Sequence, residues 1–558
     1  MAETVASAGR LPTGVPRLDG LLGGGLLRGR SLLLKGPPGS GKTTLGMQML
    51  VAGATSYGEP GLLLTFEQVP EQLYEDAAGF GWDLPELARQ NRLQVFFIQP
   101  REVLEHPGRH ETRLLARIED WVAETGARRI LVDSISHLRP LYTGEDARAM
   151  FMNFILRLKQ MGLTPVMTAE LTVEDGLRDF DVYLADAVFE LSFAPGAAHQ
   201  PDRRELRIAK TRGHDHVPGA HPYDIGPEGI VIYPHDPVSI AGPSAAPTAP
   251  RSSGVVGLDL LLGGGYSPGS TVLAAGLSGT FKTTLAGHFL TAAADRGEGA
   301  LWIHFLEESA ELTRAMEGRG LAVGRAREAG RLFLRRHPPG AHPVERILHE
   351  AEQTIRDNGV SAVVVDGLDE LTLTLAEGER RHEAALWFAE RLRAVGATAL
   401  FTQRLERVTG RNPLSEIAMA ELADTIVYLG LVEIESRLEK VISVLKHRRG
   451  AAVEDLRSIQ CTPHGLNVSD RFVGLSGVLA GAPLGRRKAQ IENIFQPLYF
   501  VRDFLGVAQD PGLDPAQRAE VLNSLSDQTG KLIELLGQYF DEPTVGGPPP
   551  APAKESRA

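Results

Sequence analysis

The 558-residue sequence has a single cysteine, Cys461, and no apolar run near the ~18–20 residues that cross a membrane. One cysteine excludes an internal disulfide framework and a cysteine-rich zinc ribbon. The first residues also lack the basic and apolar regions of a secretory signal. These absences predict a cytoplasmic protein with no membrane-spanning segment.

The sequence also lacks an excess of positive charge. It has 58 basic and 70 acidic side chains, a formal net charge of −12. Affinity for nucleic acid grows with the number of phosphates that a protein neutralises, so strong non-specific binders are usually basic. The charge balance disfavours nucleic acid as the partner, although a local basic stripe is compatible with an acidic total.

What the sequence does contain is a complete phosphate-binding loop, Gly36–Thr43, which recurs as Gly276–Thr283. In such loops small residues let backbone N–H groups turn onto the phosphates, while the lysine neutralises charge and the threonine takes a place on Mg²⁺. Phe281 stands where the first copy has Gly41. Because a residue with a Cβ does not readily adopt positive φ, we expect the second site to be altered. The predicted nucleotide-binding residues are Gly36, Gly39, Ser40, Gly41, Lys42, Thr43, Thr44, Gly279, Thr280, Lys282, Thr283 and Thr284.

Other segments recur in the same order. A short apolar run precedes each loop, and a helix is expected to begin at each lysine. A second pair of apolar runs ends in acidic residues, and a third pair ends at Asp133 and Asp366. These two aspartates, with Thr43 and Thr283, are the predicted Mg²⁺ ligands, partly through water. Alternating strands and helices predict an α/β fold with two tandem P-loop domains, each a doubly wound sheet.

Composition sets the predicted domain boundaries. A stretch rich in proline, alanine and serine separates the two copies, and the repeat stops near residue 470. Two helical patterns follow, at about 486–505 and 514–540. In the second the leucines fall near a 3-4 spacing, and the end of the chain is rich in proline. The predicted units are a flexible N-terminus 1–11, a first domain 12–236, a linker 237–252, a second domain 253–470, a helical tail 471–542 and a disordered end 543–558.

The order of these elements, with the opening Thr13-Gly14-Val15-Pro16-Arg17-Leu18-Asp19, resembles the RecA-like ATPases. Within them the sequence is similar to the double-domain KaiC family of circadian-clock ATPases over residues 12–470. The resemblance implies ATP and Mg²⁺ as ligands, ATP hydrolysis, and a homo-hexameric ring with ATP between neighbouring subunits.

The resemblance also implies roles for individual residues. The family's paired catalytic glutamates fall at Glu67-Gln68 and, 240 positions later, at Glu307-Glu308. The first half therefore keeps one glutamate of the pair, with Glu67 as its candidate base, and the second half is expected to keep both. The residues expected to reach a neighbour's nucleotide are Lys210, Arg212 and His216 in the first half and Lys446 and Arg448 in the second.

The clock-type members phosphorylate an adjacent serine and threonine in the second domain. Aligning the sequence on Asp424 places Ala420-Glu421 at that pair, with Ser415 nearby. Alanine has no hydroxyl to accept phosphate, and glutamate carries a fixed negative charge. This departure counts against a phosphorylation cycle of the clock type.

The sequence therefore predicts a KaiC-like signalling or regulatory protein that binds and hydrolyses ATP, with a regulatory partner at its C-terminal tail. Two alternatives stay open. One is a serine/threonine kinase or autokinase that uses Glu307 and Glu308. The other is a RecA-like DNA-associated ATPase or scaffold, against which the acidic charge counts.

Overall fold

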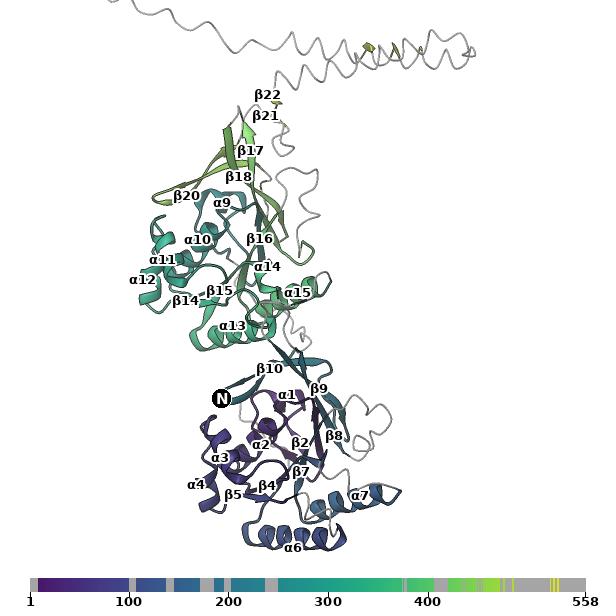
Figure 1. Ribbon diagram of the computed structural model, residues 1–558. Coiled ribbons are helices and arrows are strands. Elements are labelled where there is room, and N and C mark those ends of the chain that lie inside the picture. Colours follow the sequence, from purple (N-terminus) through teal and green to yellow (C-terminus); the bar gives the residue numbers. More distant parts are fainter. Residues whose placement is uncertain are drawn as a thin grey trace, which may run out of the picture.

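The computed structural model places both copies of the repeat (Figure 1). It describes residues 9–99, 107–136, 145–170, 185–194, 202–235, 249–373, 375, 379–405, 420–434, 437–448, 450, 453, 455–471, 475–476, 484–485, 522, 525–526 and 529–530. In these residues no helix has both the length and the apolar character needed to span a membrane.

The first half is built on a nine-stranded sheet with the order β11-β10-β9-β8-β3-β7-β6-β4-β5. From β8 to β5 neighbouring strands are parallel, and β9, β10 and β11 extend the other edge as antiparallel strands. The parallel strands are continuous apolar runs such as Leu32–Leu34, because helices cover both of their faces. The strands are β3 Leu32–Gly36, β4 Gly61–Thr65, β5 Leu93–Phe97, β6 Arg129–Asp133, β7 Thr164–Glu170, β8 Ala187–Ala194, β9 Arg203–Thr211, β10 Ala220–Gly226 and β11 Gly229–Ile232.

Two core clusters hold helices against the two faces of this sheet. One includes residues of α1 to α4, and the other includes residues of α6 and α7 (Figure 1). A small pair of strands, β1 Arg10–Leu11 and β2 Leu26–Leu27, lies outside the main sheet. The helices are α1 Leu18–Leu21, α2 Lys42–Ser56, α3 Pro70–Ala78, α4 Leu84–Arg89, α6 Pro107–Thr125 and α7 Glu145–Gln160.

The second half repeats this sheet strand for strand. Its order is β14-β13-β15-β16-β12-β17-β18-β19-β20, which is the order of the first sheet listed from the opposite edge. The strands are β12 Thr271–Gly276, β13 Gly299–His304, β14 Leu332–Arg336, β15 Val360–Asp366, β16 Thr398–Arg404, β17 Thr425–Ile434, β18 Arg437–His447, β19 Arg457–Thr462 and β20 Gly465–Arg471. The helices are α9 Val256–Leu261, α10 Lys282–Asp295, α11 Ser309–Glu317, α12 Val323–Glu328, α13 Val344–Asn358, α14 Leu368–Leu371 and α15 Glu379–Ala394.

The predicted α/β fold with two tandem domains is confirmed, and α2 and α10 begin at Lys42 and Lys282 as expected. Residues 10 and 11, which we assigned to a flexible N-terminus, form β1 instead because they pair with β2. In the predicted helical tail, β21 Leu475–Ser476 and β22 Leu484–Gly485 form a short antiparallel pair. Most of the linker and tail, the end 543–558 and Ser415 lie outside the described residues.

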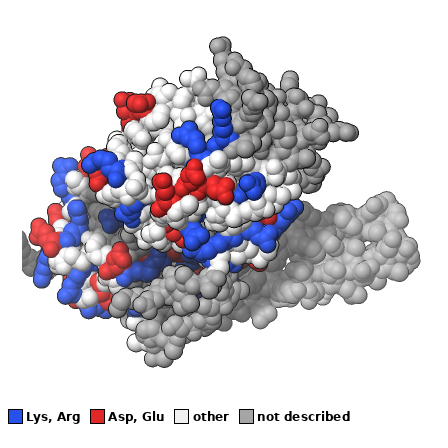
Figure 2. All heavy atoms as spheres, turned by 90° about the horizontal axis from the view of Figure 1, so that it is seen from below, with Lys and Arg blue, Asp and Glu red and all other residues white. Residues whose placement is uncertain are grey.

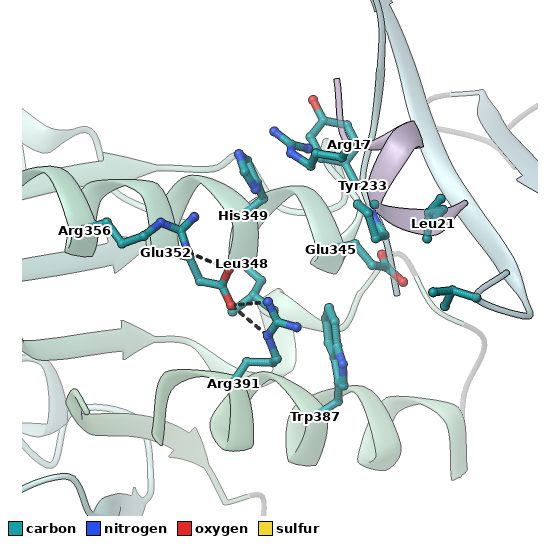
Figure 3. Close-up of a pocket in the computed structure, with 13 residues that line it drawn as sticks. Arg17, Leu21, Tyr233, Glu345, Leu348, His349, Glu352, Arg356, Trp387 and Arg391 are labelled. Carbon is teal, nitrogen blue, oxygen red and sulfur yellow. Dashed lines mark hydrogen bonds and ion pairs between the residues drawn. The ribbon is translucent and has the colours of Figure 1, made fainter. Parts of the chain in front are cut away.

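The two halves meet where α13 and α15 of the second face the β10–β11 side of the first (Figure 1). Arg346 on α13 donates to the Asp224 carboxylate at 2.7 Å, and the rings of His235 and Trp387 stack with centroids 4.4 Å apart. A cavity of about 480 Å³ lies at this junction. In it Glu352 is paired with Arg391 at 2.7 Å (Figure 3). The two halves are therefore joined by both an ion pair and a pair of stacked rings.

Surface charge agrees with the mixed composition. Among the described residues on the face shown in Figure 2, basic and acidic side chains are interspersed. That face offers no broad basic field of the kind that tracks a nucleic-acid backbone.

Candidate functional site

The first phosphate-binding loop joins the central strand β3 to α2. Gly39 and Gly41 have φ of 78° and 84°, so the chain turns through left-handed conformations that glycine adopts without strain. The Lys42 ammonium donates to the carbonyl oxygens of Gly36 and Pro37 at 2.9 and 3.0 Å. The loop thus curls around its own lysine at the N-terminus of a 15-residue helix, which is a prepared anion site.

Asp133 stands at the end of β6, beside this loop. Its Oδ1 accepts hydrogen bonds from Thr43, at 3.3 Å, and from the buried Thr168. Burial raises the pKa of Asp133, and these two hydrogen bonds oppose the rise. A hydroxyl and a carboxylate oxygen side by side are hard ligands that fit Mg²⁺, directly or through its waters. The structure therefore brings together the predicted residues Lys42, Thr43 and Asp133.

A cavity of about 700 Å³ opens in front of the first loop. Glu67, which follows β4, lines it and is exposed. Burial lowers the pKa of Lys42, against the opposing charges of Glu170 and Asp133. Sequence reasoning missed Glu170, the last residue of β7. No local motif marks it, because its place beside the loop follows from the pairing of β7 with β3.

The second loop has the same geometry. Lys282 donates to the carbonyl oxygens of Gly276 and Leu277 at 2.9 and 2.7 Å. Asp366 accepts from Thr283 at 3.4 Å and from Thr402 at 2.7 Å. Burial lowers the pKa of Lys282 and raises that of Asp366, as in the first site. A cavity of about 510 Å³ lies in front of this loop.

Phe281 departs from our expectation, because it adopts the positive φ that we considered difficult for it, at 73°. The strands behind the loop explain how its side chain is accommodated. In the first half a Cβ on Gly41 would lie 2.8 Å from Cδ1 of Ile225. The matching position in β19 is the smaller Cys461, and both it and Phe281 pack against the second core. The Phe281 ring also lies 3.8 Å under the Lys440 ammonium.

The glutamates of the two halves do not correspond at the 240-residue offset that we expected. Thr65 pairs opposite Asp133, and His304 pairs opposite Asp366, so these strands are offset by 239 residues. Glu67 therefore corresponds to Leu306, and the next residue, Gln68, corresponds to Glu307. The expectation that the second half keeps both glutamates is wrong in this register, because α10 is one residue shorter than α2.

The side chains of Leu306, Glu307 and Glu308 have different surroundings. Leu306 is 68% exposed at the mouth of the second cavity, which Glu307 also lines. Glu308 corresponds to Val69 and forms an ion pair with Arg336 at 2.9 Å. Among the described residues that line the cavity, Glu308 does not occur. Each half thus has one glutamate at the paired positions, the first half at the first position and the second half at the second.

The residues expected to reach a neighbouring subunit lie at the ends of matching strands, β9 and β18, or just after them. The His216 ring is 3.1 Å from the Thr211 hydroxyl. Lys446 and Arg448 donate to the backbone carbonyls of Ala420 and Glu421, at 2.5 and 2.7 Å. None of Lys210, Arg212, His216, Lys446 and Arg448 is among the described residues that line the two cavities of their own chain.

The family model described as "ATPase: KaiC" matches residues 11–237 and again 251–471. The chain is 30% identical to a circadian clock oscillator protein KaiC of Thermostichus vulcanus, over 86% of this chain and 93% of the relative. It is 29% identical to that of Synechococcus elongatus, over 85% and 92%, and 28% identical to that of Acaryochloris marina, over 90% and 96%.

Proposed function

Because the chain belongs to the KaiC family of ATPases, we propose that its first half hydrolyses ATP and that its second half holds nucleotide as a regulatory site. One observation carries the proposal. In matching strand registers, the first site presents Glu67 and the second presents the apolar Leu306. A carboxylate can orient water and take up its proton, whereas a leucine side chain can do neither.

In the proposed reaction Lys42 and the loop amides hold the β- and γ-phosphates. Thr43 and Asp133 would hold Mg²⁺, which supplies neutralising charge to the phosphates when it is bound. Glu67 orients the attacking water in line with the γ-phosphorus and accepts its proton. The bond from the γ-phosphorus to the bridging oxygen breaks, so that ADP and phosphate leave.

We further propose a homo-hexameric ring in which Lys210, Arg212 and His216 of one subunit reach the nucleotide of the next. The charges of the first cavity support this arrangement. Among the described residues that line it, Lys42 is the only cation, beside five carboxylates. A cation delivered by a neighbour stabilises charge on the transferring phosphoryl group and contributes ~10³–10⁵ in rate in related enzymes. Lys446 and Arg448 would serve the second ring in the same way, and the tail would present the regulatory partner site.

The test is phosphate release by the purified full chain. Lys42→Ala and Glu67→Gln are each expected to reduce turnover by ~10²-fold or more, the scale of a positioned acid–base group. Glu308→Gln is the matched control, because Glu308 faces Arg336 and not the cavity. Normal turnover by Lys42→Ala would overturn the assignment to the first half.

A kinase activity of the second half is the second candidate, and the observation that favours it is Glu307 in the same cavity as Thr283 and Asp366. Incubation with ATP labelled at the γ-phosphate, followed by mapping of label, separates the two. Label on this chain or on a partner favours the kinase. Phosphate release without label favours hydrolysis alone.

A further inference from the structure

The two nucleotide cavities differ in charge at positions that the sheets place in the same register. Glu170 ends β7 opposite Gly36, and Arg404 ends β16 opposite Gly276. Each lines the cavity of its half. A carboxylate beside the first loop is thus replaced by a guanidinium beside the second.

Two more positions change in the same direction. The turns after α3 and α11 match, since Gly81 and Gly320 have φ of 74° and 80°. Counting back from them, Phe80 corresponds to Arg319 and Asp76 corresponds to Ala315, and all four line their cavities. The Arg319 guanidinium donates to Thr284 at 3.0 Å, so it is held at the first turn of α10.

Lys440 on β18 brings a further cation to the second loop. Its ammonium lies 3.8 Å from the centroid of the ring of Phe281, a residue of the second loop. The matching residue of β9, Arg204, lies instead over the Phe193 ring at 4.9 Å. The phenylalanine that replaces a loop glycine therefore also provides the surface on which this lysine rests.

These replacements invert the charge of the cavity. The described lining of the first contains one cation and five carboxylates, whereas that of the second contains four cations and three carboxylates. Arg404 also lowers the pKa of Lys282, after the larger effect of burial, whereas Glu170 opposes the lowering of the pKa of Lys42. A polyphosphate that enters the first cavity meets like charge unless a divalent cation accompanies it.

We propose that the second site binds the triphosphate of ATP without a divalent cation, with Arg404, Arg319 and Lys440 supplying the positive charge. The first site, in contrast, accepts ATP only together with Mg²⁺. This inference rests on the proposed function in one respect, that both loops bind nucleotide. It assigns the second half a nucleotide that stays bound when Mg²⁺ is scarce.

The test is ATP binding by the full chain, measured with radiolabelled ATP and filtration in Mg²⁺ or in EDTA. Lys42→Ala reports on the second site and Lys282→Ala on the first. We expect Lys42→Ala to bind ATP similarly in both buffers, and Lys282→Ala to lose at least about tenfold in affinity in EDTA. Equal losses in the two variants would overturn the proposal, as would the absence of binding to Lys42→Ala in both buffers.

Exchanging Arg404 for the residue type at the matching position of the first half tests whether this residue makes ATP binding independent of Mg²⁺. Arg404→Glu copies the first half, and in the Lys42→Ala background it should make ATP binding dependent on Mg²⁺. Arg404→Lys keeps the charge and should leave binding in EDTA within about threefold. Binding of ATP by Arg404→Glu in EDTA at the unchanged affinity would contradict the role of this residue. Phosphate release by the same proteins tests the hydrolytic assignment separately.

Discussion

Arg346 of the second half donates to Asp224 of the first at 2.7 Å, and this pair joins the two halves. The two side chains are 29% and 40% exposed, so solvent screens their attraction. We expect Arg346→Ala and Asp224→Ala to show a coupling energy under about 1 kcal/mol in a double-mutant cycle of urea unfolding. A coupling of several kcal/mol would contradict the expectation that solvent screens this pair.

The buried pair Arg129–Glu59 should contribute far more to stability than the Arg346–Asp224 pair. Arg129 is 1% exposed under α2, and its Nε donates to Glu59 at 2.7 Å. Glu59→Gln leaves a buried guanidinium without its counter-charge, which should lower the free energy of unfolding by about 3–5 kcal/mol. Glu86→Gln is the control, because its partner Arg89 is largely exposed. Similar unfolding midpoints for the two variants would contradict this prediction.

Exchanging residues between the halves tests how Phe281 is accommodated. Gly41→Phe should destabilise the first half by about 2–4 kcal/mol, since it combines left-handed backbone strain with a clash against Ile225. Adding Ile225→Cys, which copies the second half, should recover part of that loss and part of the ATP binding. The measurements are thermal unfolding and filtration binding. No recovery in the double variant would show that Cys461 does not make the room for Phe281.

Leu306→Glu should increase hydrolysis by the second site. It places a carboxylate at the register position of Glu67, and a positioned base contributes ~10²–10⁴ in rate, so we expect a gain of at least about tenfold. Phosphate release is measured in the Lys42→Ala background, where the first site is disabled. Leu306→Gln has the same shape without the charge and should give no gain. Equal rates for the two variants would count against a base at this position.

Acid should destabilise the second half through His337. The ring is 4% exposed, and burial lowers its pKa to about 4. In the unfolded chain this histidine has a pKa of ~6.5 and takes up the proton first, so its contribution to stability falls as the pH decreases from ~6.5 to ~4 and is constant above that window. At about pH 5 the loss should be on the order of 2 kcal/mol by urea unfolding. His337→Gln should reduce the pH dependence of the free energy of unfolding between pH ~4 and ~6.5. An unchanged dependence in this variant would contradict the role of His337.

The sequence was sufficient for the features that depend on local pattern. Both phosphate loops, the helices that begin at Lys42 and Lys282, and the aspartates at strand ends follow from residue type and spacing. These elements are short in sequence, so their chemistry can be recognised without knowledge of pairing.

Features that depend on strand register could not be predicted in the same way. Glu170 and Arg404 reach the loops only because β7 and β16 pair with strands more than 100 residues away. The correspondence between Glu67 and Leu306 was missed because α10 is one residue shorter than α2. The offset of 240 residues between the two loops therefore does not hold for the next pair of strands, β4 and β13, which are offset by 239.

The identical strand order of the two sheets also bears on how the chain folds. The central strands β3 and β12 pair with equivalent neighbours in their own sheets. During folding, a strand of one half can therefore pair incorrectly with the equivalent neighbour in the other half. Synthesis separates the two searches in time. Lys282 leaves the ribosome 240 residues after Lys42, a delay of roughly 12–48 s at ~5–20 residues per second. The first sheet can form before the strands of the second half have been synthesised. When the whole chain refolds from denaturant, all strands are present at once and this order is lost.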